Sequence, residues 1–179
     1  MMILRYQLFL ACHIGWKYFY SVQYTQGISM VPTIPHSHGA SPMVLISKLY
    51  GRGRNVKVGD IVLFTHPIKP QENGAKRIVG MPGDYVCVVS PGKTDDDVED
   101  GDIVKSEVRE EMIQVPEGHC WVIGDNMEWS RDSRLFGPLP LALVKGKVLG
   151  VWLPWLRFKW FSNPLVEVQN RESKTIIIH

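Results

Sequence analysis

Short apolar segments separated by turn residues constrain the fold of this chain more than any other feature. Between Val44 and Cys87, stretches such as MVLISKLY, VGDIVLF and MPGDYVCVV alternate with polar breaks such as GRGRN and HPIKPQENG. Segments of this length, bounded by Gly, Pro, Asn and Asp, are typical of β-strands joined by tight loops. Residues 113–123 and 141–152 repeat the pattern, and no sustained 3.6-residue period follows Tyr50. We therefore expect a mainly β body, in the form of a β-barrel or sheet.

The composition is that of a single globular domain. Of the 179 residues, 45% are hydrophobic and 21% are charged, so neither disorder nor a multi-pass membrane protein is indicated. A formal net charge of +2 without a long basic run disfavours nucleic-acid binding. The three cysteines lie far apart without a CxxC pair, which argues against a zinc cage or a disulfide framework. Cys87 and Cys120 lie among apolar residues, and we expect both to be buried in the core.

The first segment, residues 2–20, is apolar and aromatic but makes only a marginal membrane span. Three polar side chains interrupt it: Arg5, His13 and Lys17. A removable signal is disfavoured because no small-residue cleavage site separates this segment from the polar motif that follows. We expect a retained N-terminal anchor helix over 1–24, a folded domain over 25–165 and a tail over 166–179. The aromatic side chains expected at the membrane interface are Trp16, Tyr18 and Tyr20. An amphipathic or core helix is the alternative.

Two polar inserts are expected to form loops. Residues 90–111 are strongly acidic in their first half and carry few large apolar side chains, which is typical of a solvated loop or hairpin. His36 and His38 are spaced like a possible metal pair, but they lie among Pro, Ser and Gly with no carboxylate nearby. We therefore expect a flexible loop at these histidines, and we predict no metal and no cofactor.

Three stretches carry candidate chemistry. Residues 27–33, GISMVPT, place Ser29 in a segment that a proline holds extended. Residues 76–84, KRIVGMPGD, place Lys76 at the start of an apolar strand that leads into a Pro-Gly-Asp turn. Residues 124–134, GDNMEWSRDSR, form a polar loop that is too long and too charged for a simple hairpin turn. Long polar loops on β scaffolds often carry function.

Together the three stretches resemble the conserved boxes of the type I signal peptidases, which are serine proteases with a Ser-Lys dyad: SMxPT, KRxxGxPGD and GDNxxxSxDSR. VGDIVLF at 58–64 is similar to a further box, and the resemblance runs from Gly27 to Val148. It is nearest to the mitochondrial inner membrane protease branch, catalytic subunit 1 type. The supporting stretches are GRGR at 51–54, VPEGH at 115–119 and FKW at 158–160. The endoplasmic reticulum branch has a histidine where this chain has Lys76.

The resemblance implies a role for each matching residue. Ser29 is implied as the nucleophile and Lys76 as its general base. Ser130 is expected to hydrogen-bond Lys76 and to orient it toward Ser29. Asp132 and Arg134 are expected to pair and to hold the loop.

Two further residues are implied in substrate binding. Met30 is expected to line the pocket for the substrate's small side chain. Gly27 stands where some bacterial relatives carry a serine whose hydroxyl stabilises the oxyanion. The backbone N–H of Ser29 is therefore the oxyanion donor that the resemblance supplies here.

Lys76 can act as the base only in its neutral form. A free lysine has a pKa of ~10.4, whereas a general base for neutral pH needs a pKa of ~7–8. Burial among apolar side chains can lower a lysine pKa that far. Ile78 and Val79 follow Lys76, so the sequence is in keeping with a desolvated amine.

The implied function is that of a membrane-bound serine endopeptidase that removes presequences or signal peptides. The branch implies the mitochondrial inner membrane, with the catalytic domain facing the intermembrane space to which the cleaved proteins are sorted. It also implies a hetero-oligomer with a related protease subunit and presequence-bearing substrates bound as extended strands. A non-catalytic scaffolding subunit of the same complex and a bacterial-type signal peptidase I are the alternatives.

Overall fold

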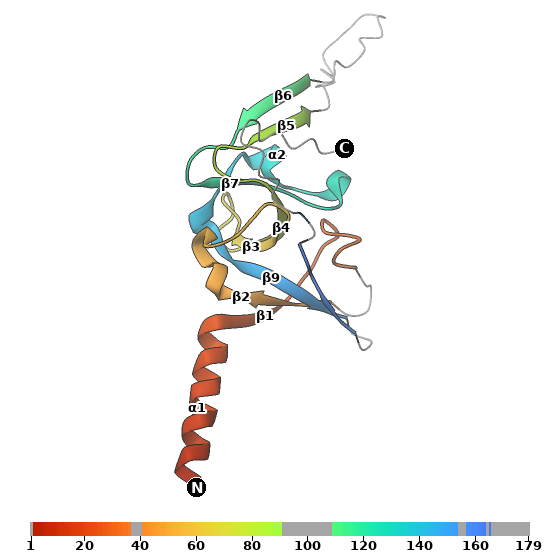
Figure 1. The fold of residues 1–179 in the computed structure, drawn as a ribbon. Coiled ribbons are helices and arrows are strands. Elements are labelled where there is room, and N and C mark those ends of the chain that lie inside the picture. Colours follow the sequence, from red (N-terminus) through yellow and green to blue (C-terminus); the bar gives the residue numbers. More distant parts are fainter. Residues whose placement is uncertain (1, 37–40, 91–108, 154–156, 164, 166–179) are drawn as a thin grey trace, which may run out of the picture.

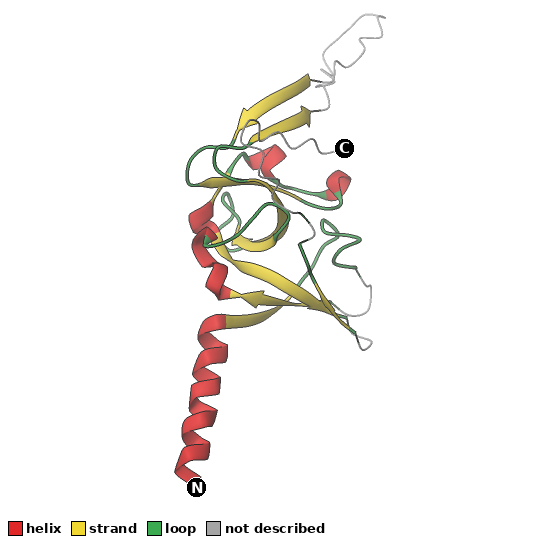
Figure 2. Cartoon of the chain, in the orientation of Figure 1, coloured by secondary structure: helices red, strands yellow, loops and turns green. Residues whose placement is uncertain are grey.

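The computed structural model describes residues 2–36, 41–90, 109–153, 157–163 and 165. Helix α1 (Met2–Phe19) projects from a body built of strands (Figure 1, Figure 2). The strands are β1 (Tyr20–Tyr24), β2 (Met43–Ser47), β3 (Ile61–Thr65), β4 (Asn73–Gly80), β5 (Tyr85–Ser90), β6 (Arg109–Gln114), β7 (His119–Ile123), β8 (Leu139–Pro140), β9 (Val144–Trp152) and β10 (Phe158–Trp160). The short helical turns are η1 (Lys48–Gly53), η2 (Met127–Trp129), α2 (Ser133–Phe136) and η3 (Leu141–Leu143).

One antiparallel sheet organises the body. Its strand order is β1-β2-β9-β3-β4-β7-β8, and β10 adds to β9. The long strand β9 pairs with β2 along one edge, and with β3 and then β10 along the other. β5 and β6 form a separate two-stranded hairpin, which lies at the end of the body away from α1 (Figure 1). The expectation of a mainly β body is therefore confirmed.

Strand β3 separates two apolar cores. Ile61 and Leu63 join the cluster that contains Met30, whereas Val62 and Phe64 join the cluster formed with β7 and β8. Side chains alternate across a strand, so a continuous apolar run such as IVLF indicates a strand that is covered on both faces. This central strand pairs with β4, which carries the candidate lysine.

Cys87 is exposed, and the expectation that it lies in the core is wrong. It is on β5 between Val86 and Val88, whose side chains are buried on the opposite face of the strand. Because the β5–β6 hairpin lies outside the main sheet, only one of its faces packs on the core. Cys120 on β7 is buried as expected, and burial raises the pKa of its thiol to about 12.

Helix α1 ends at Phe19, which is before the end of the anchor helix expected over 1–24. Residues Tyr20–Tyr24 instead form β1, because they pair in antiparallel register with β2 and so extend the sheet. Trp16 and Tyr18, two of the aromatic residues expected at a membrane interface, are exposed. Among the described helices, none has the length and apolar character that a membrane crossing requires.

Several predicted segments lie outside the described residues. They are the insert 37–40 with His38, the acidic segment 91–108 and the tail 166–179. Strands β5 and β6 flank the acidic segment on either side and pair with each other as the two arms of a hairpin.

Candidate active site

Ser29 lies in a tight turn between β1 and β2. The Val31 N–H donates to the Ile28 carbonyl at 3.1 Å across this turn. Gly27, which precedes it, has a φ of 99°, a left-handed conformation that favours glycine. A serine at position 27 would be strained in this conformation.

Met30 points into the core. Its side chain is 5% exposed and belongs to a buried cluster with Ile34, Val44 and Val148. The Ile34 N–H donates to the Met30 carbonyl at 2.8 Å, which folds this segment back over the cluster. Met30 therefore contributes to core packing, and its role in lining a substrate pocket stays a prediction.

Lys76 on β4 is brought beside Ser29 although 47 positions separate the two in sequence. The distance between Lys76 Nζ and Ser29 Oγ is 2.5 Å. Lys76 is 6% exposed, and this burial lowers the pKa of its amine, while the charges of Asp132 and Asp125 act more weakly in the opposite direction. A buried amine in contact with a hydroxyl is an arrangement in which lysine can take the hydroxyl proton.

The loop 124–134 is bonded directly to the serine segment. The Asn126 N–H donates to the Ser29 carbonyl at 3.0 Å. The Asn126 side-chain Nδ2 donates to the Ile28 carbonyl at 3.1 Å. A Cβ on Gly124 would collide with the Ser29 carbonyl oxygen and with the Ser130 hydroxyl. Glycine is therefore needed at position 124 for the loop to approach this closely.

Asp132 and Arg134 form a bidentate ion pair within this loop. Arg134 Nε and Nη2 donate to the two carboxylate oxygens, each at 2.9 Å. Asp132 is fully buried and also accepts from the Gly124 N–H at 3.0 Å. Burial by itself would raise the pKa of Asp132, but these hydrogen bonds and the Arg134 charge outweigh it and lower the pKa.

A second ion pair, Arg77 with Asp125, connects the loop to β4. Arg77 Nε and Nη2 donate to the Asp125 carboxylate at 2.8 and 2.7 Å. Arg77 Nη1 donates to the Gly59 carbonyl at 2.8 Å, and Nη2 lies 3.4 Å from the Thr33 hydroxyl. Because Arg77 directly follows Lys76, this one side chain joins the strand of the lysine, the serine segment and the loop.

Ser130 is buried, but the expected hydrogen bond to Lys76 is absent. Among the residues that the structure describes, its Oγ makes no hydrogen bond of good geometry, although it lies close enough to the Asp132 carboxylate to help lower the pKa of that group. The hydroxyl lies against Gly124, and the lysine contacts Ser29 instead. An unpaired buried hydroxyl costs about 1–3 kcal/mol, so Ser130 is available to a polar group that reaches it.

The two carboxylates whose charges act on Lys76 both form ion pairs with arginines. Asp125 is held by Arg77 and Asp132 by Arg134. Within the described part of the chain, no three His, Cys, Asp or Glu side chains converge as a metal site would require. The groups left for chemistry are the Ser29 hydroxyl, the Lys76 amine and the Ser130 hydroxyl.

Most of the sequence of this chain matches a known protein family. The family described as "Signal peptidase, peptidase S26" matches residues 2–155. The chain belongs to the signal peptidase family. The resemblance seen in the sequence boxes is thereby confirmed, and the dyad candidates lie inside the matched region.

Several relatives in the signal peptidase family match most of the chain. The "Mitochondrial inner membrane protease subunit 1" of Saccharomyces cerevisiae is 36% identical over 90% of this chain and 88% of its own length. The protein of the same name from Schizosaccharomyces pombe is 37% identical over 85% of this chain and 84% of its own length. The one from Homo sapiens is 35% identical over 76% of this chain and 71% of its own length. A solved structure, signal peptidase I from Enterococcus faecalis, is 26% identical with a TM-score of 0.39, over 52% of this chain and 97% of that chain.

Four residues that hold the site together have no role predicted from the sequence of this signal peptidase family member. They are Arg77, Gly124, Asp125 and Asn126. All four lie inside the conserved boxes, and their adjacency to candidate residues was the available signal. The contacts themselves join boxes that are far apart in sequence, so the order of residues along the chain could not reveal them.

Proposed function

We propose that this chain is a serine endopeptidase of the signal peptidase type, with Ser29 as the nucleophile and Lys76 as its general base. The observation that carries the proposal is the 2.5 Å contact between Lys76 Nζ and Ser29 Oγ, at a buried position where the lysine pKa is lowered. A lysine in water is charged at neutral pH and cannot accept a proton, whereas a desolvated lysine can.

Catalysis begins when Ser29 Oγ attacks the scissile carbonyl carbon and its proton passes to the neutral Lys76 amine. Negative charge then develops on the former carbonyl oxygen, and the Ser29 backbone N–H stabilises it. Among the described residues this N–H has no other acceptor. The Lys76 ammonium gives its proton to the leaving amine as the peptide bond breaks. A water molecule, deprotonated by the same amine, then hydrolyses the acyl-serine ester.

The polar loop supports this chemistry. We assign to the unpaired Ser130 hydroxyl the hydrogen bond to Lys76 that the family implies, formed when the lysine carries the proton and must be held for its return. The pair of Asp132 and Arg134 keeps the loop in shape around that hydroxyl. The second pair, made by Arg77, keeps the loop aligned with the dyad of Ser29 and Lys76.

The substrates in this proposal are presequences or signal peptides that bind as extended strands. A Cβ on Gly27, two residues before the nucleophile, would meet nothing within 4 Å, which leaves open space at that position for a substrate. The relatives are named as mitochondrial inner membrane proteases, which supports the same membrane for this chain. That the body faces the intermembrane space is part of the proposal. The "Mitochondrial inner membrane protease subunit 2" of Danio rerio is 30% identical, which supports pairing with a second, related subunit.

Cleavage of a presequence-bearing substrate in detergent tests the proposal. Ser29→Ala and Lys76→Met should each lower kcat/KM by at least about a thousandfold, because no neighbouring group can replace the nucleophile or the base. Lys57→Met makes the same change at an exposed lysine and is the matched control, which should cleave like the wild type. Circular dichroism establishes that each variant is folded.

Normal cleavage by a folded Ser29→Ala or Lys76→Met variant would overturn the dyad. Wild-type protein that binds the presequence but never cleaves it would make the chain a scaffolding subunit instead. Loss of cleavage with retained substrate binding in both variants is the result that we expect.

A further inference from the structure

The stretch 51–54, GRGR, has no part in the proposed catalysis, yet its geometry is specific. Within η1 the backbone kinks, with a ψ of 148° at Gly51 and a left-handed φ of 59° at Arg52. A Cβ on Gly51 would lie 3.2 Å from a β9 carbonyl oxygen, and a Cβ on Gly53 would lie 2.7 Å from an η3 side chain. The two glycines therefore allow η1 to pack directly on β9 and η3.

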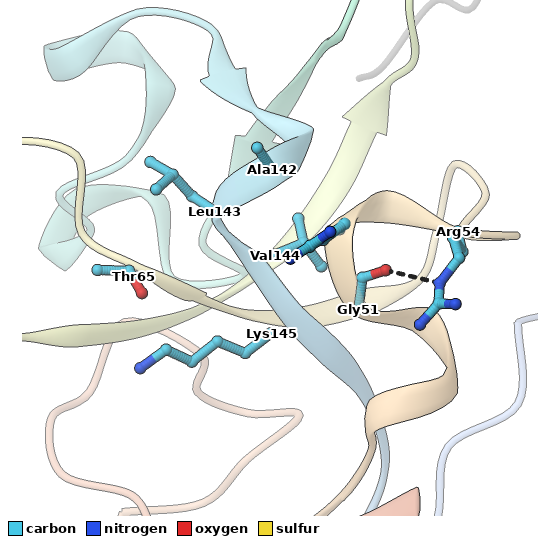
Figure 3. Close-up of a pocket in the computed structure, with 8 residues that line it drawn as sticks. Gly51, Arg54, Thr65, Ala142, Leu143, Val144 and Lys145 are labelled. Atoms are coloured by element: carbon cyan, nitrogen blue, oxygen red, sulfur yellow. Dashed lines mark hydrogen bonds between the residues drawn. The ribbon is translucent and has the colours of Figure 1, made fainter.

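The two arginines that alternate with these glycines are exposed beside a pocket. The pocket has a volume of about 590 Å³ and lies between η1, β3 and β9 (Figure 3). Three cations line it, Arg52, Arg54 and Lys145, together with the apolar side chains Leu143 and Val144. None of the described lining residues is acidic. A pocket of this size and mixed character suits a ligand with a compact anionic group and an apolar part.

The guanidinium groups at this pocket retain unused donors. Arg54 Nε donates to the Gly51 carbonyl at 3.2 Å, which orients the side chain (Figure 3). Over the described ranges, neither Arg52 nor Arg54 forms an ion pair. A guanidinium fork matches the oxygens of a phosphate group in a bidentate arrangement. Lys145 Nζ is held by Asn73 Oδ1 at 2.6 Å, and its side chain extends away from Arg54 (Figure 3).

The left-handed backbone at Arg52 also indicates a specific role. This conformation is unfavourable for a residue with a Cβ, and glycine or asparagine adopts it more easily. The chain nevertheless has an arginine at this position, fixed between two glycines that pack on neighbouring elements. Local strain of this kind is retained where it presents a side chain for binding.

The surroundings of η1 indicate the kind of anion. Lys48 Nζ donates to the Lys17 carbonyl at 2.8 Å, so η1 begins at the end of α1 (Figure 1). The next residue, Leu49, is 50% exposed, and the end of α1 presents the exposed rings of Trp16 and Tyr18. Exposed apolar and aromatic side chains beside basic ones are typical of a protein surface that rests at a membrane interface.

We propose that Arg52 and Arg54 form a binding site for the phosphate of an anionic phospholipid headgroup. Headgroup binding holds the β body against the bilayer surface next to α1. The site does not include Ser29 or Lys76, so its test does not depend on cleavage.

The test is isothermal titration calorimetry on the full chain in detergent. Short-chain phosphatidylglycerol, short-chain phosphatidylcholine and inorganic phosphate are each titrated separately. We expect the wild type to bind phosphatidylglycerol, and Arg52→Asn/Arg54→Gln to bind it at least about tenfold more weakly, because two charges beside the phosphate are lost. Asparagine is chosen at position 52 because it tolerates the left-handed backbone. Lys57→Gln/Lys69→Gln removes two exposed charges that do not line the pocket, and this control should bind like the wild type.

Arg54→Gln alone leaves the kink at residue 52 unchanged and should show a smaller loss, which separates ligand binding from an effect on folding. The proposal would be overturned if phosphatidylcholine bound as tightly as phosphatidylglycerol, or if the double variant kept wild-type affinity. Inorganic phosphate that bound as tightly as phosphatidylglycerol would overturn the lipid assignment. A loss confined to the pocket variants and to the anionic lipid supports it.

Discussion

Two arginine–carboxylate pairs hold the loop 124–134, one from within and one from outside. Arg134 pairs with Asp132 two positions away in the same loop, and that carboxylate is fully buried. Arg77 reaches Asp125 across 48 positions and contacts the serine segment as well. The inner pair, Asp132 with Arg134, therefore shapes the loop. The outer pair, Arg77 with Asp125, aligns the loop with the dyad of Ser29 and Lys76. The stability of the loop and its alignment with the chemistry are carried by separate interactions.

The largest loss of stability is expected from Arg134→Ala, which leaves the Asp132 carboxylate buried without a counter-charge. Breaking a buried pair in this way typically costs about 3–5 kcal/mol. The Arg134 side chain is 28% exposed and Gly124 still donates to the carboxylate, so we expect the lower end, about 3 kcal/mol. Urea unfolding measures this loss, and Arg134→Lys, which keeps the charge but not the fork, should recover part of it. An unchanged free energy of unfolding would show that the inner pair does not shape the loop.

Arg77→Ala should cost less stability, about 2 kcal/mol, because the Asp125 side chain is 15% exposed and water can reach it. Its effect on cleavage should exceed that of Arg134→Ala, since the loop loses its link to β4 and to the serine segment. The comparison of kcat at saturating substrate between the two variants measures this difference. A greater loss of kcat in Arg134→Ala would contradict the division of roles.

Acid should weaken both pairs. Burial raises the pKa of Asp125 and of Asp132, but hydrogen bonds from the arginines outweigh it, so both pKa values lie below the ordinary 3.8. A carboxyl with a lowered folded-state pKa stabilises the fold above its unfolded pKa, and this contribution is lost as the pH falls through the folded pKa. The free energy of unfolding should therefore drop as the pH falls below 3.8, and the drop should be shallower in Asp125→Asn. If the free energy of unfolding fell equally steeply with pH in the wild type and in Asp125→Asn, the pair of Arg77 and Asp125 would not stabilise the fold.

Asn126→Ala should have the smallest effect on stability, about 1 kcal/mol, because it removes one side-chain hydrogen bond to the Ile28 carbonyl and keeps the backbone bond to Ser29. The free energy of unfolding and kcat together test whether this bond aligns the nucleophile. Asn126→Asp is the matched variant, since it keeps the size but places an acceptor against a carbonyl. Cleavage that is unaffected by both changes would assign the alignment to Arg77 alone.

Local features of this chain can be predicted from its sequence because they depend on neighbouring residues. The apolar run in β3 and the turn residues around it indicate a strand, and the boxes mark Ser29 and Lys76 as candidates. The prediction of a lowered lysine pKa follows from the apolar residues that come after Lys76. These features need no knowledge of which distant segments meet.

Contacts between distant segments could not be predicted in the same way. Helix α1 ends at Phe19 because the next residues pair with β2, and no local breaker marks that position. Cys87 is exposed because its hairpin lies outside the main sheet, which the apolar character of β5 does not indicate. Arg77 and Asp125 meet only because β4 and the polar loop are adjacent in the folded chain.

The pKa of Lys76 tests whether this lysine is the general base. In protein labelled with ¹³C at the lysine Cε, the Lys76 resonance, identified by its loss in Lys76→Arg, reports the protonation of this amine as the pH is varied. We predict one lysine that titrates well below the ~10.4 of exposed lysines, and a rising limb of kcat/KM against pH with the same midpoint. If Lys76 titrates together with the exposed lysines while cleavage proceeds at neutral pH, Lys76 is not the general base and the Ser-Lys mechanism is wrong.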